Sequence, residues 1–81
     1  MPATLDEVRA AIHVAFPDAD LDKIEERDSG IGGIIVSREF AGLDVSQRNQ
    51  LINEKVLYPL GLRGLNVGVL YALAPRETLY D

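Results

Sequence analysis

The 81-residue chain contains no cysteine, only one histidine and no apolar stretch as long as a membrane span. Without cysteine it cannot form a disulfide scaffold, supply a thiol nucleophile or bind a metal through thiolates. A membrane-spanning helix needs about 20 consecutive apolar residues, and the start of the chain shows no signal-peptide pattern. These absences favour a cytoplasmic protein without a membrane anchor.

The single histidine and the net negative charge further limit the functions that the chain can have. A Ser-His-Asp assembly would have to use His13, which lies in no recognisable motif. No carboxylate–histidine spacing suggests a metal site, so the sequence predicts a non-enzymatic protein without metal or cofactor. Eight basic residues face thirteen acidic ones, giving a formal net charge of −5. That charge opposes nucleic-acid binding, which depends on neutralised phosphates.

Hydrophobic periodicity divides the chain into elements of one domain over residues 1–81. Apolar residues recur at spacings of three and four in the first element and predict a helix over residues 5–16. Thr4 and Glu7 have the spacing of a capping box at its start. Pro17 ends the helix, because the residue before a proline avoids the α-helical region.

Two strands joined by a glycine-rich turn are predicted next. Residues 21–27 carry charges that suit an edge strand, since charge there discourages pairing with other chains. Residues 34–36 are a β-branched run typical of a central strand. The glycines of residues 29–33 could form a phosphate cradle, but no P-loop lysine follows and no helix begins there. A hairpin turn is the favoured interpretation.

A second helix and a third strand complete the chain. Asp44 and Gln47 have capping-box spacing and predict a helix that ends at about Leu57, because the next residue precedes Pro59. Residues 65–73 alternate and predict a strand. One face of that strand would carry Leu65, Val67, Val69, Tyr71 and Leu73.

The predicted order is helix, strand, strand, helix, strand. This αββαβ order defines an α+β fold in two layers, with a three-stranded sheet and both helices packed on one face. If the second and third strands pair in parallel, the connection through the second helix is a right-handed crossover.

Several short motifs occur at the spacing of a known family. They are Asp28-Ser29-Gly30, Ile35-Val36-Ser37, Phe40-x-Gly42, Arg48 and Ile52-Asn53. At these positions the chain resembles the BolA-like family. The resemblance implies a mixed three-stranded sheet in a fold similar to class II KH domains. It also implies one of two non-catalytic activities: partnership with monothiol glutaredoxins in iron–sulfur, iron-homeostasis or stress-response regulation, or transcription regulation through a KH-like nucleic-acid surface.

The chain departs from the family where iron would be bound. The family histidine before the last strand corresponds to Arg63, and the hairpin loop that often supplies a second ligand contains only residues 29–33. A protonated guanidinium cannot ligate iron, and the imidazole or thiolate ligands that iron needs are missing at both places. The expected glutaredoxin partner would therefore be bound without cluster ligation by this chain.

The resulting hypothesis is an interaction domain that binds a protein partner through Arg48, Asn53 and Arg63. The alternative is a KH-like nucleic-acid-binding transcriptional regulator that uses Arg38, Arg48, Lys55 and Arg63. A KH domain clamps the nucleic-acid backbone with a Gly-x-x-Gly loop; residues 61–64 have that spelling but are predicted as a turn. A purely structural module is a third interpretation, and the sequence leaves the oligomeric state open.

Overall fold

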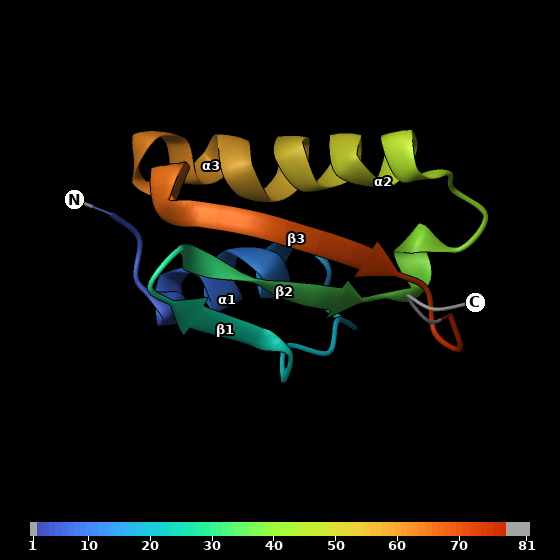
Figure 1. Ribbon diagram of the computed structural model, residues 1–81. Coiled ribbons are helices and arrows are strands. Elements are labelled where there is room, and N and C mark those ends of the chain that lie inside the picture. The colour runs from blue at the N-terminus through green and yellow to red at the C-terminus, as the bar shows by residue number, and fades with distance from the viewer. Residues whose placement is uncertain (1, 78–81) are drawn as a thin grey trace.

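The structure, a computed structural model, describes residues 2–77, which form a three-stranded mixed sheet covered on one face by helices (Figure 1). β1 (Ile24–Arg27) pairs antiparallel with β2 (Gly30–Val36), and β2 pairs in parallel with β3 (Val67–Leu73). The strand order β1-β2-β3 makes β1 and β3 the edge strands. The α+β class, the element order and the edge position of the first strand are therefore confirmed.

The first helix, α1 (Leu5–Ala15), begins at the predicted capping box. The backbone N–H of Glu7 donates to the Thr4 hydroxyl, and the N–H of Thr4 donates to the Glu7 carboxylate. The apolar stripe of α1 buries Val8 and Ile12 against the inner face of the sheet. The ring of Phe16, directly after the helix, is fully buried and packs against a second aromatic ring, which lies in the connection after β2.

That second ring belongs to Phe40, in the short 3₁₀ helix η1 (Arg38–Phe40). The two ring centroids lie 4.9 Å apart with a tilt of 52°. This tilted arrangement is one that aromatic pairs favour. The pair therefore links the end of α1 to the connection that leads into α2 (Val45–Ile52).

The second helical segment is longer than predicted, and its expected end at about Leu57 was wrong. α2 continues as a π-helical segment, η2 (Asn53–Leu57), then as α3 (Tyr58–Leu60) and a 3₁₀ segment, η3 (Gly61–Asn66). A proline inside a helix lacks the N–H donor and its ring clashes with a carbonyl one turn earlier. The wider π segment ends at Leu57, two residues before Pro59, and Pro59 occupies the first turn of α3, where a proline is tolerated.

The predicted glycine turn was also placed wrongly. Only Asp28 and Ser29 form the turn, and the glycines that follow belong to β2. The neighbouring backbones approach these glycines closely: a Cβ on Gly33 would lie 1.9 Å from the Lys23 carbonyl oxygen. A Cβ on Gly32 would lie 2.6 Å from the Val69 carbonyl oxygen. The glycines therefore serve sheet packing, as is common for glycine within strands.

A bulge in β3 overturns the predicted alternation of its two faces. Ile31 is opposite Val67 but Gly33 is opposite Leu70, so β3 contains one extra residue between these pairs. Val67 consequently packs against the core together with Leu70. It does not share the open face with Val69, as the simple period of two predicted.

Candidate partner-binding surface

Arg48 lies in α2 and binds the segment just before this helix, the end of β3 and Glu77. Its Nε donates to the Leu43 carbonyl and its Nη1 to the Ala72 carbonyl, both at 3.0 Å. Its two Nη atoms also bind both carboxylate oxygens of Glu77, at 2.7 and 2.9 Å. Only 13% of the Arg48 side chain is exposed. The guanidinium, predicted as a contact for a partner or a nucleic acid, is thus engaged within the domain.

The ion pair shifts the pKa values of Arg48 and Glu77 in the directions expected for opposite charges. The Arg48 guanidinium, followed by the N–H of Ala74, lowers the pKa of Glu77 to about 2. Hydrogen bonding to Glu77 raises the pKa of Arg48. Both groups are therefore charged near neutral pH, and the pair holds the end of β3 against the start of α2.

The other cations predicted to form a basic patch are also paired with carboxylates. Arg38 lies 3.6 Å from Asp18, and Lys55 lies 3.6 Å from Glu39. The Lys55 ammonium also lies 5.7 Å from the centroid of the Phe16 ring. Each positive charge near the second helix thus has a negative neighbour, which reduces the local attraction for phosphates.

Arg63 and Asn53, the remaining predicted partner contacts, lie in different surroundings. Arg63, in η3, pairs with Glu7 of α1, and its carbonyl accepts the N–H of Ala3. Asn53 is exposed at the start of η2, and its side chain forms no hydrogen bond among residues 2–77. The Gly-x-x-Gly spelling of residues 61–64 falls in η3, a 3₁₀ segment that leads into β3.

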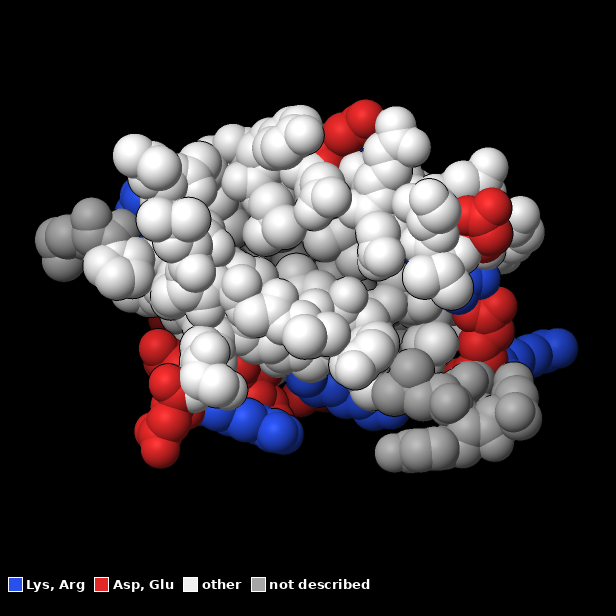
Figure 2. All heavy atoms as spheres, turned by 45° about the horizontal axis from the view of Figure 1, so that its top comes forward, with Lys and Arg blue, Asp and Glu red and all other residues white. Residues whose placement is uncertain are grey.

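The face over α2 and β3 is largely free of charged side chains, which gather along its rim (Figure 2). Val45 is 74% exposed in α2, and Val69 and Tyr71 are 63% and 50% exposed on β3. Asn49 and Asn53 lie one helical turn apart beside them. We call these five residues, Val45, Asn49, Asn53, Val69 and Tyr71, the neutral surface.

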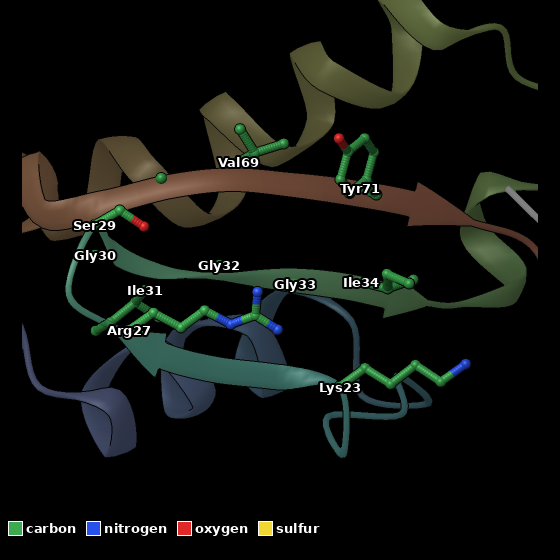
Figure 3. Close-up of a pocket in the computed structure, with 11 residues that line it drawn as sticks. Lys23, Arg27, Ser29, Gly30, Ile31, Gly32, Gly33, Ile34, Val69 and Tyr71 are labelled. Atoms are coloured by element: carbon green, nitrogen blue, oxygen red, sulfur yellow. The ribbon is translucent and has the colours of Figure 1, made fainter.

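A hollow of about 490 Å³ extends the neutral surface across the open face of the sheet (Figure 3). The glycines of β2 form its floor, because they carry no side chains to fill it. Val69 and Tyr71 border it on one side, and Lys23, just before β1, and Arg27 of β1 border it on the other. Arg27 is paired with Glu25 at 2.9 Å. The hollow is broad and open to solvent, a shape that suits contact with a macromolecule better than enclosure of a small substrate.

No group of three or more potential metal-ligating His, Cys, Asp or Glu residues occurs in the part of the chain that the structure describes. His13 is exposed near the end of α1. None of the helices within residues 2–77 has the length and apolar character needed to cross a membrane.

Comparisons with known proteins gave no match to a family model, to a curated protein or to a solved structure. The surface described above is therefore interpreted from its own geometry and chemistry.

Sequence reasoning missed most of the neutral surface. The predicted site residues did not include Val45, Asn49, Val69 or Tyr71, although two signals were present. Asn49 and Asn53 are separated by four residues on a predicted helix, which places them on one side. Residues 67–73 also contain no charge, unlike the charged first strand at the opposite edge of the sheet.

Proposed function

We propose that this protein is a non-catalytic, BolA-like interaction domain with a fold similar to class II KH domains, and that it binds a protein partner through the neutral surface. The observation that carries the proposal is the exposure of Val45, Val69 and Tyr71 on a face largely free of charged side chains. Exposed apolar patches of this kind commonly mark interaction sites. The αββαβ order and the motif resemblance at Arg48 and Asn53 support the family assignment.

The partner that the resemblance favours is a monothiol glutaredoxin, in iron–sulfur or stress-related regulation. This chain would bind the glutaredoxin without ligating its cluster. In the resemblance, Arg63 takes the position of the family histidine, and its guanidinium is paired with Glu7. The alternative, a nucleic-acid-binding regulator, has less support because Arg38, Arg48 and Lys55 each lie beside a carboxylate.

An NMR titration of the labelled domain with a monothiol glutaredoxin, with and without its [2Fe–2S] cluster, tests the proposal. We expect amide shifts in α2, η2 and β3 with both forms of the partner. Val69→Lys should weaken binding at least about tenfold, because it places a charge in the middle of the apolar contact. Val14→Lys is the matched control: Val14 is 81% exposed on α1, outside the neutral surface, and its variant should bind within about twofold of the wild type.

Two results would contradict the proposal. If neither form of the glutaredoxin shifts any amide, this partner is wrong. If a single-stranded oligonucleotide binds at low salt and is released as salt rises, the nucleic-acid alternative replaces the protein partner. Loss of that binding in Lys55→Ala would locate the contact on the second helical segment.

A further inference from the structure

The free edge of β3 is unprotected, whereas the edge formed by β1 is charged. Three of the four residues of β1 are Glu25, Glu26 and Arg27, and such charges discourage pairing with another strand. The seven residues of β3 carry no charge. A long, uncharged edge strand is a template for another strand, so it requires either cover or a partner.

Backbone groups along this edge point away from β2. The Leu73 carbonyl accepts the N–H of Ser37, next to β2, at 3.0 Å, whereas the Ala72 carbonyl accepts Arg48 Nη1 from the side of α2. Successive residues of a strand direct their hydrogen-bonding groups to opposite sides. The N–H of Ala72 and both backbone groups of Leu70 are therefore directed to the free edge.

A groove runs along this edge, between β3 and α2. Two hollows of about 280 and 300 Å³ adjoin each other between α2 and β3, and both are lined by Asn49 and Leu70. One hollow continues to Asn53 and Gly68, and the other to Val45 and Tyr71. The side-chain amides of Asn49 and Asn53 form no hydrogen bond within the described chain, so both can donate and accept.

The helical layer explains why this groove exists. Neighbouring strands lie about 4.8 Å apart and packed helices about 8–10 Å apart, so two helices cover about four strand positions. The sheet supplies three strands. α1 lies behind β1 and β2, and α2 lies along the outer side of β3 (Figure 1). The uncovered fourth position is therefore beside β3, under α2.

We infer that this groove accepts an extended, uncharged peptide segment of a protein partner as a fourth strand; this rests on the proposed function and specifies how the partner is held. Leu70 can exchange two backbone hydrogen bonds with the segment, and the Ala72 N–H can donate a third. Asn49 and Asn53 can bind its outer edge. Arg48 occupies the Ala72 carbonyl and so closes one end of the groove.

Two other occupants fit less well. Nucleic acid would need free cations, but the one charged residue among those lining the two hollows is Arg48, which is paired with Glu77. A second copy pairing β3 antiparallel with β3 would have its two-fold axis perpendicular to the sheet. Both α2 helices would then lie on the same face of the joined sheet and would compete for the same space above the two paired β3 strands.

Selection of random nonapeptides displayed on phage against the purified protein tests the inference. Selected peptides should contain at least four consecutive uncharged residues. When a synthesised winner is titrated into the labelled protein, the Leu70 and Ala72 amides and the side-chain amides of Asn49 and Asn53 should shift. Hydrogen exchange of the Leu70 amide should slow at least about tenfold at saturation, because a free-edge N–H becomes bonded.

Asn49→Asp places a charge in the groove with little change in shape, and we expect it to weaken peptide binding at least about fivefold. Gln50→Glu is the matched control: it makes the same amide-to-acid change at the next residue of α2, outside both hollows, and should bind within about twofold of the wild type. Equal effects of the two substitutions would overturn the inference.

The inference also fails if no winner protects Leu70, if Leu70 becomes protected by raising protein concentration alone, or if an oligonucleotide of ten thymidines protects it instead. Glutaredoxin binding that leaves Leu70 and Ala72 unprotected would overturn the fourth-strand inference while supporting the proposed function. Peptide binding in the groove without any glutaredoxin shift would support the groove and contradict that partner.

Discussion

Replacing Arg48 should destabilise the fold, because its guanidinium joins α2 to β3. Its guanidinium donates to the carbonyl of Leu43, just before α2, and to the carbonyl of Ala72, in β3. Arg48→Ala removes both hydrogen bonds and leaves two carbonyls without this donor. A hydrogen bond to a charged group contributes about 1.5–3 kcal/mol.

Because water can enter the space that the Arg48 side chain leaves, we take about 1.5 kcal/mol, the lower end of that range, for each of the two hydrogen bonds. The expected loss is about 3 kcal/mol. The Glu77 carboxylate is accessible to water, so screening makes the contribution of its pair with Arg48 smaller than that of the two carbonyl bonds. An 81-residue domain has a total stability of roughly 4–12 kcal/mol, so this loss is a large fraction. The melting temperature should fall by roughly 12–24 °C.

Urea denaturation followed by circular dichroism measures the change, with Arg48→Lys as the matched variant. Lysine keeps the charge but not the planar fork, so about half of the loss should remain. A decrease in the free energy of unfolding of less than about 1 kcal/mol in Arg48→Ala would refute the stabilising role of these two hydrogen bonds. A lysine variant as stable as the wild type would show that charge alone suffices.

Three further predictions concern stability. The pKa of Glu77 is lowered to about 2 from an ordinary value of 4.5, so its stabilising contribution is complete above about pH 4.5 and is lost as pH falls toward 2. Between these pH values the urea midpoint of Glu77→Gln should fall less steeply with decreasing pH than the midpoint of the wild type. Equal slopes for the two proteins would contradict the pairing. Gly33→Ala should cost at least about 2 kcal/mol, because φ is +142° and the new Cβ would meet a carbonyl oxygen at 1.9 Å. The control Gly42→Ala, with φ of +79° and open space, should cost about 1–2 kcal/mol, and equal urea midpoints for the two would refute the clash. Phe40→Ala, which empties a fully buried site, should cost about 3–5 kcal/mol in the same assay, and a loss below about 1 kcal/mol would contradict its role in the core.

The functional proposals concern a surface that differs from the one predicted from charge. The sequence pointed to cations because the family resemblance and the KH-like alternative both suggest polar recognition. The structure pairs Arg38, Arg48, Lys55 and Arg63 with carboxylates. What remains exposed over α2 and β3 is apolar and amide-bearing, which favours a polypeptide partner.

Features that depend on neighbouring residues were predictable from the sequence. The capping boxes at Thr4 and Asp44, the helix over residues 5–16 and the element order are examples. Each capping box joins residues three positions apart, so no distant contact is required to specify it. The charges that identified the first strand as an edge are likewise a local property.

Features that depend on distant contacts were decided by the tertiary structure. Arg48 could be recognised as a residue flanking an apolar stripe, but its partners Ala72 and Glu77 are 24 and 29 residues away. The bulge that turns Val67 toward the core is defined by its register with β2. The groove beside β3 arises because two helices cover more width than three strands supply. Local sequence patterns specify each element separately, whereas the way in which the elements fit together determines which side chains and backbone groups remain exposed.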